Sequence, residues 1–248
     1  MIKKVFVVLL VILGVSACSK HDPILPGDRI DIFDNNDVKI ANQDVPVLSD
    51  EMTNIYGDED CEYRQDTTNT IWSGDKKIFS GFATGATVKS NQKPVCDGGF
   101  VFAGLSTGEV VKINPKNKKI IWVADVFRAS NLTGGASVVD IVARVGVDKK
   151  FVYAGGLGDA FCKLNKNTGD KIWCVNISVP VDFVIVDSFA FVVGADNNLY
   201  AIDINAGKVY WKTEVKKQVK PVYEKNLITV GNQKINSKDG SIVKSGLW

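Results

Sequence analysis

Four cysteines offer the clearest possible chemistry in this sequence. Cys162 and Cys174 lie on the two arms of a predicted hairpin, at similar distances from its turn. Opposite residues of a hairpin can form a disulfide if their Cα atoms lie within about 7 Å. A redox pair is the alternative, but no Cys-x-x-Cys motif or basic flank is present to lower a thiol pKa. The pattern therefore favours a structural disulfide or a buried thiol. Cys61 and Cys96 could then pair with each other by elimination, although the sequence does not show this pairing.

Other candidate sites are weak. The single histidine, His21, lies near the N-terminus, so the rest of the chain has no histidine for a catalytic triad or a multi-histidine metal site. The acidic run at 58–62 lacks the alternating ligand spacing of an EF-hand loop. The glycines at 155–158 lack the third glycine of a dinucleotide loop and join two predicted strands. The sequence thus predicts no catalytic residue, metal site or cofactor, and we expect no enzyme activity.

Composition excludes one class of partner. The chain has 248 residues, of which 45% are hydrophobic and 23% charged, as in ordinary globular proteins. Without Lys3 and Lys4 it has 28 basic and 28 acidic residues. Nucleic-acid binding depends on clustered basic residues, so we do not expect a nucleic-acid partner.

The first residues indicate export and a lipid anchor. Lys3 and Lys4 precede an uncharged run at 5–17, which is too short for a membrane span of about 20 residues and suits a signal peptide. The end of this run, Val-Ser-Ala-Cys18, resembles the bacterial lipobox, in which the cysteine is acylated, for example with palmitate; an ordinary signal peptide is the alternative. Ser19 favours sorting to the outer membrane, again by resemblance. We expect a signal peptide at 1–17 and a polar tether from lipidated Cys18 to residue 45.

The remainder, 46–248, is a repeat. Three segments, 100–122, 151–173 and 189–211, align without gaps. In each, an aromatic-led strand is followed by a second strand with alternating apolar residues, an Asn or Asp turn, and a third strand that ends in Trp. The turn carries Gly in two segments and Lys118 in the other. A shorter copy spans 227–240, and a degenerate copy ends near residue 72. The predicted repeat tryptophans are Trp72, Trp122, Trp173 and Trp211.

Repeats of about 40–50 residues with several strands each are typical of propeller blades. The sequence therefore predicts an all-β propeller of four-stranded blades, reduced to about four or five. A strand at 38–48 would complete the final blade and remove its exposed edge. The tryptophan column suits packing between blades better than stacking on a flat cofactor, because each Trp buries a large surface.

The repeat also supports a family resemblance. Residues 191–211 contain a strand, a turn, a strand ending in Ile-Asp, and Gly-x-x-x-Trp, which resembles the PQQ-type propeller repeat. Together with the lipobox, the tether motif at 25–30 and the segment at 137–141, the chain resembles the BamB family, lipoproteins of the outer-membrane β-barrel assembly machine. That family usually has eight blades, whereas this chain has fewer.

The resemblance implies a scaffold at the periplasmic face of the outer membrane. It implies docking onto the periplasmic domains of the barrel-insertion protein BamA and onto other subunits of the machine. One contact loop of the family matches 86–89 here, which assigns Val88 and Lys89 to partner binding. A second, acidic contact matches Asp140, with Val138 replacing its first acidic residue.

Two alternatives remain. One is a quinoprotein-like enzyme of the same repeat superfamily, which resembles this chain in the Trp-bearing repeat. Those enzymes carry adjacent cysteines and a Ca²⁺ site, whereas this chain lacks a Cys-Cys pair and is shorter. The other alternative is a propeller lipoprotein that binds an envelope polysaccharide or a different lipoprotein. Fold alone does not separate it from the assembly scaffold.

Overall fold

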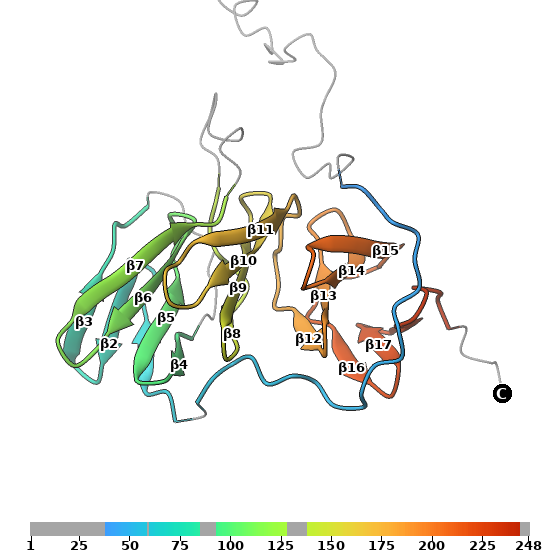
Figure 1. Cartoon of the computed structure of the whole chain (residues 1–248). Helices are drawn as coiled ribbons and strands as arrows, with labels where there is room; N and C mark the ends of the chain where they lie inside the picture. The colour runs from blue at the N-terminus through green and yellow to red at the C-terminus, as the bar shows by residue number, and fades with distance from the viewer. Residues whose placement is uncertain (1–37, 59, 85–92, 128–137, 244–248) are drawn as a thin grey trace, which may run out of the picture. The chain divides into compact units, whose positions relative to one another are not determined.

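The computed structural model describes residues 38–58, 60–84, 93–127 and 138–243. These residues form five antiparallel sheets, which we number blade 1 to blade 5 in chain order (Figure 1). The fold is a reduced all-β propeller, as the sequence predicts. In the described ranges no helix is present, and none therefore has the length and apolarity to cross a membrane.

Blades 2, 3 and 4 have four strands each, joined in chain order. Blade 2 contains β4 (Val95–Asp97), β5 (Phe100–Gly104), β6 (Glu109–Asn114) and β7 (Lys119–Asp125). Blade 3 contains β8 (Gly146–Val147), β9 (Phe151–Gly156), β10 (Ala160–Asn165) and β11 (Lys171–Val175). Blade 4 contains β12 (Val184–Val186), β13 (Phe189–Val193), β14 (Asn198–Asp203) and β15 (Lys208–Glu214).

Blades 1 and 5 have three strands each. Blade 1 contains β1 (Tyr63–Gln65), β2 (Thr70–Ser73) and β3 (Lys76–Ser80). Blade 5 contains β16 (Val222–Glu224), β17 (Leu227–Val230) and β18 (Gln233–Asn236). An isolated bridge between Ile235 and Ile242 marks the place of a fourth strand in blade 5.

The predicted repeat covers the last three strands of each complete blade. The first strands, β4, β8, β12 and β16, were not predicted from the sequence; they are only two or three residues long. A segment this short cannot show the alternation of apolar residues that identifies a strand. In a propeller the first strand of each blade is the innermost one, and we call its unpaired side the inner edge.

Four hydrophobic clusters hold consecutive blades together, one between each pair. Between blades 2 and 3, for example, Phe102 and Trp122 pack with Val152 and Leu164. Each strand of a complete blade contributes alternate residues to one cluster or the next, as period-two alternation requires. The core is therefore a series of interfaces between sheets.

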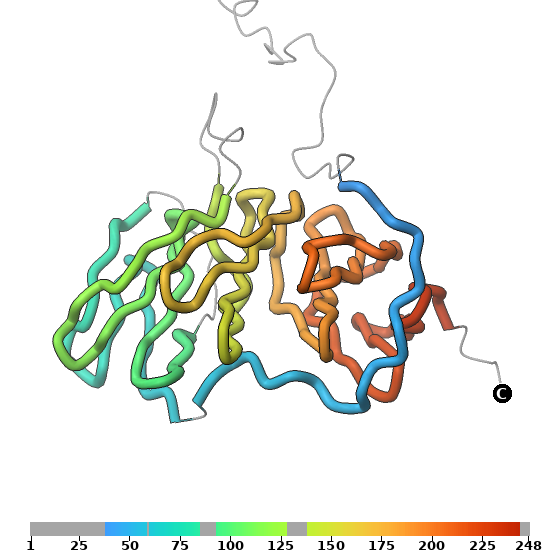
Figure 2. The backbone as a smooth tube through the Cα atoms, viewed as in Figure 1, coloured from blue at the N-terminus to red at the C-terminus, as the bar shows by residue number. Residues whose placement is uncertain are grey.

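A segment that we call the strap, residues 38–58, crosses these blades before blade 1 begins (Figure 2). Ile40 forms a parallel bridge with Val209 at the outer edge of blade 4. Val45 and Leu48 are buried in the cluster between blades 4 and 5. Residues 38–45, assigned to the tether from sequence, therefore pack against the propeller.

The strap does not add a strand to blade 5, which differs from the expectation for 38–48. Between the described residues of the strap and blade 5 there is one main-chain hydrogen bond, in which the N–H of Val45 donates to Lys238 O at 2.7 Å. Pro46 follows directly. Proline has no N–H to extend a ladder, so this segment packs by its side chains instead.

The prediction that Trp72 is a repeat tryptophan like the other three is wrong, as the register of blade 1 shows. In blades 2, 3 and 4 the register pairs each column tryptophan with residue 112, 163 or 201 of the preceding strand. In blade 1 the same position, beside the bulge, pairs Ile71 with Phe79. Trp72 lies on β2, the strand before, because the β2–β3 turn is shorter than the turns of the other blades. Phe79 therefore takes the place of the repeat tryptophan.

Candidate interaction surface

The repeat tryptophans form joints between blades. The indole N–H of Trp122 donates to Lys166 O at 3.0 Å, that of Trp173 to Ile204 O at 3.1 Å, and that of Trp211 to Ser237 O at 3.2 Å. Each acceptor lies in the turn that follows the third strand of the next blade. Trp72 differs, since it donates to Asp66 of its own blade at 2.8 Å.

Each joint also uses the turn glycine. A Cβ atom at Gly169, Gly207 or Gly240 would lie 2.7–2.8 Å from the ring of the preceding blade's tryptophan. These glycines have φ between 67° and 79°, in the left-handed region. The Gly-x-x-x-Trp motif thus pairs a glycine of one blade with a tryptophan of the blade before. In the joint between blades 1 and 2, Lys118 with φ 58° stands at the position of the glycine. Phe79 of blade 1 stands there at the position of the tryptophan.

We predict that Gly207→Ala will lower the free energy of unfolding by about 3 kcal/mol, as positive φ and overpacking each cost about 1–3 kcal/mol. The new methyl group would meet the Trp173 ring. Gly74→Ala is the matched control, because Gly74 has φ 54° but open space around its Cβ position. We expect it to cost about 1 kcal/mol. Urea denaturation measures both; equal losses would contradict the proposed role of the glycine in the joint.

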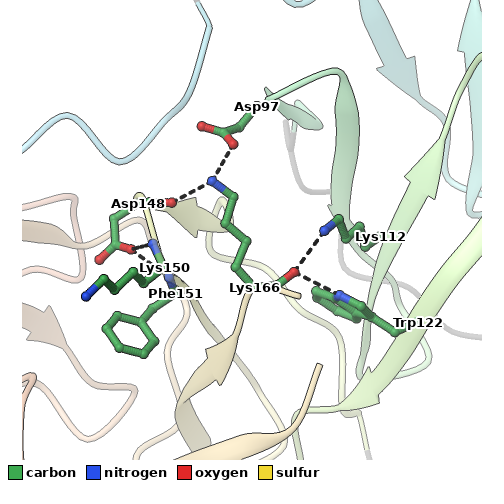
Figure 3. Close-up of polar contacts among 7 residues, drawn as sticks. All are labelled: Asp97, Lys112, Trp122, Asp148, Lys150, Phe151 and Lys166. Atoms are coloured by element: carbon green, nitrogen blue, oxygen red, sulfur yellow. Dashed lines mark hydrogen bonds and ion pairs between the residues drawn. The ribbon is translucent and has the colours of Figure 1, made fainter. Parts of the chain in front are cut away.

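Two buried lysines strengthen these joints. Lys112 Nζ donates to Lys166 O at 3.0 Å, the carbonyl that also accepts the Trp122 N–H (Figure 3). Lys163 Nζ donates to Ile204 O at 2.8 Å and lies 3.7 Å from the Phe151 ring centroid. Burial lowers the pKa of both lysines. Lys166 in turn forms an ion pair with Asp97 of blade 2. The lysines therefore help to hold neighbouring blades together.

The described residues contain two disulfides. Cys162 and Cys174 are direct partners across β10 and β11, with Cα atoms 4.1 Å apart. Cys61 and Cys96 have Cα atoms 5.4 Å apart. Cys61 precedes β1 and Cys96 lies in β4, so this second bond joins blade 1 to blade 2.

The structure only partly places the residues assigned to partner binding. Val88 and Lys89 lie outside the described residues. Asp140 is only 4% exposed, and its carbonyl accepts the N–H of Leu157 at 2.9 Å. A carboxylate this buried is not a freely accessible contact for a partner.

Described residues next to these positions, Thr84 and Ile141, nevertheless meet at one turn, Leu105 to Gly108. Thr84 Oγ1 lies 2.8 Å from Ser106 Oγ, and the N–H of Ile141 donates to Leu105 O at 3.1 Å. Exposed hydrophobic side chains lie on both segments: Phe82 is 84% exposed and Val138 is 40% exposed. We call Phe82, Val138 and the turn 105–108 the turn surface.

A second group of residues was missed from sequence. It centres on Tyr56 of the strap, with the Arg144 guanidinium carbon 4.8 Å and Lys220 Nζ 4.7 Å from its ring centroid. The Tyr56 hydroxyl donates to Phe183 O at 2.7 Å. Burial raises the pKa of Tyr56; Asp182 nearby adds to the rise and Arg144 opposes it. The tyrosine therefore stays protonated and able to donate.

These charged residues share one place in the repeat, two positions before each first strand. The column consists of Lys93, Arg144, Asp182 and Lys220. It is visible in the sequence only once the short first strands are known. Among the described residues, no group of three or more His, Cys, Asp or Glu side chains is placed to hold a metal ion.

The comparisons with known proteins fit this architecture. BamB from Moraxella catarrhalis is similar in structure, with a TM-score of 0.64 and 16% identity over 73% of this chain and 59% of that one. This chain therefore spans less than two thirds of the Moraxella protein. A likeness at this identity shows the fold alone.

Two dehydrogenases match less well. Quinohemoprotein alcohol dehydrogenase from Comamonas testosteroni has a TM-score of 0.42 and 21% identity, over 52% of this chain and 21% of that one. A europium-containing methanol dehydrogenase has a TM-score of 0.43 and 20% identity, over 54% of this chain and 26% of that one. At these TM-scores neither likeness bears on function. No curated protein sequence matches the chain.

The sequence profile described as outer membrane protein assembly factor BamB matches residues 35–213 and 162–244. These matches include all five blades and the whole strap. The chain therefore belongs to the BamB family.

Proposed function

We propose that the protein is a non-enzymatic scaffold that assists the assembly of β-barrel proteins in the outer membrane. It is anchored at the periplasmic face through acylated Cys18 and docks onto the periplasmic domains of a BamA-like insertion protein. Family membership supports the assembly role. Docking needs an accessible surface rather than a titrating group, which agrees with the structural use of the buried lysines and the tryptophans.

The turn surface carries this proposal. It brings together the two segments that lead to the assigned contacts, and it exposes Phe82 and Val138 there. Exposed apolar residues beside polar ones are typical of protein interfaces. Because Asp140 is buried, we assign it to holding its segment in place and leave direct contact to Phe82, Val88, Lys89 and Val138.

Site-specific photocrosslinking in the cell envelope tests the proposal. A photoreactive residue at position 82, 88 or 138 should capture the periplasmic domains of the insertion protein, identified by mass spectrometry. Ile172 is the control, because it is exposed and apolar but lies near the β10–β11 turn, at the opposite end of the strands. Capture of a different envelope component at these positions, or equal capture from position 172, would contradict docking through this surface.

A further inference from the structure

The strap covers the inner edges of three consecutive blades. The N–H of Asp58 donates to Cys96 O of β4 at 2.8 Å, and the N–H of Thr53 donates to Ile185 O of β12 at 2.9 Å. Between them, Val147 of β8 donates its N–H to Ile55 O at 2.5 Å. Each of these inner strands thus has a main-chain partner on the side away from its own sheet.

The inner edge of β16 lacks such a partner. Within the described residues, no main-chain hydrogen bond joins the strap to β16. Tyr223 corresponds in register to Cys96 and Ile185, since each is the middle residue of its first strand. Glu224 and Leu227 flank a two-residue turn and form a hydrogen-bonded pair, so the main-chain N–H and C=O of Tyr223 point to the inner edge.

A cavity lies beside this edge. Its volume is about 450 Å³, and it is lined by strap residues 52–56, by Val184 and Ile185 of β12, and by residues 220–222. Most of these side chains are apolar. Met52 and Val222 are each about half exposed, so the cavity is open to a partner. A volume of this size accommodates a large hydrophobic side chain with its neighbouring main chain.

Lys220 gives the cavity its charge. Its Nζ lies over the Tyr56 ring, and no carboxylate of the described residues forms an ion pair with it. Lys93 and Arg144 occupy the corresponding positions of blades 2 and 3, which makes three of the four charged residues in this column cationic. The acidic one, Asp182, accepts a hydrogen bond from the N–H of Arg144 at 2.7 Å. Asp50 and Asp187 place negative charge near Tyr223, so it is at Lys220, beside the Tyr56 ring, that the cavity favours an acidic group.

We propose that the inner edge of β16 binds an extended peptide segment of another protein, in which an apolar residue stands next to an acidic one. The peptide takes the place on β16 that the strap takes on β4 and β12, and donates an N–H to Tyr223 O. Its apolar side chain enters the cavity, and its carboxylate pairs with Lys220. This binding does not depend on the turn surface or on which protein docks there.

Met52 provides a direct signal for the test. The sequence has 2 methionines, Met1 and Met52, and Met52 lines the cavity. A ¹³C-methyl methionine NMR spectrum of the full chain therefore reports on this site, with Met52→Leu used to assign the signal. The probe is the blocked peptide acetyl-Gly-Leu-Glu-Gly-amide. We expect it to shift the Met52 methyl signal in a saturable way.

Matched probes and variants test each contact. The Gln analogue of the peptide should bind roughly fivefold more weakly, as should the Glu peptide to K220Q, because each change removes one exposed ion pair. A peptide methylated at its Leu and Glu amides should bind more weakly, because it loses the main-chain donors at the two residues that carry the side-chain contacts. K212Q removes an exposed lysine on β15 and should bind normally. An unmoved Met52 signal at millimolar peptide would overturn the proposal. So would equal binding of the Glu and Gln peptides, or full binding of the methylated one.

Discussion

Replacing Trp122 with alanine should lower the free energy of unfolding by about 4 kcal/mol, the loss typical of a large buried aromatic residue. Trp122 is 7% exposed and belongs to the cluster between blades 2 and 3. Its ring packs against Gly169 of the next blade and lies 6.0 Å from the Phe102 ring centroid. The variant would leave a cavity at the joint and remove one of the two donors to Lys166 O. Urea denaturation followed by circular dichroism measures the loss.

Trp72→Ala is the matched control. Trp72 is only partly buried, bonds to Asp66 of its own blade, and has Arg64 and Lys77 beside its ring at 5.1 and 5.7 Å. We expect its loss to cost about 1–2 kcal/mol, because no joint between blades depends on it. If the two variants were equally destabilised, the distinction between a joint tryptophan and a tryptophan within one blade would be wrong.

The repeat was predictable because its constraints recur in every complete blade. Alternating apolar residues, an Asx turn and a Trp must appear together where each sheet packs on the next. The placement of Cys162 opposite Cys174 is confirmed, and the aligned positions of the neighbouring blades, Val111 with Val123 and Tyr200 with Lys212, are direct partners as well. The motif did not reveal that its Gly and its Trp belong to different joints.

What could not be predicted depends on contacts between distant segments. The strap shows no alternation, since it follows no single sheet and bonds to four blades in turn. The inner edge of β16 becomes visible as a site only when the strap is known to pass it. Asp140 shows the reverse case: its family position indicated a contact residue, whereas packing of its segment on Leu105 and Leu157 buries it.

Blade 1 contributes fewer buried hydrophobic side chains to the core than any other blade. In β1 to β3, Ile71 is the one hydrophobic side chain that is fully buried. The joint with blade 2 has Phe79 and Lys118 in place of the Trp and Gly of the later joints. Polar contacts add some support: Asn69 donates to Phe82 O and Ser106 Oγ, both at 2.7 Å, and accepts the N–H of Ser106 at 2.9 Å.

The Cys61–Cys96 disulfide should therefore hold blade 1 in place. Replacing both cysteines with alanine should lower the free energy of unfolding by about 4 kcal/mol, from the loop entropy of a sequence separation of 35. Hydrogen exchange should then rise first in β1–β3, because this blade has the smallest buried core. Deuterium uptake by mass spectrometry, with denaturation in urea, measures both effects.

The second disulfide separates this local effect from the general loss of a crosslink. Cys162 and Cys174 close a loop with a separation of only 12 inside blade 3, so their removal should cost about 3 kcal/mol. Blade 3 would keep its tryptophan joints to blades 2 and 4, and we expect exchange to rise within β10 and β11 rather than in a whole blade. If removing Cys61–Cys96 raised exchange equally in all five blades, blade 1 would not be the weakest unit. In that case its joint must be as strong as those made by tryptophan and glycine, despite lacking both.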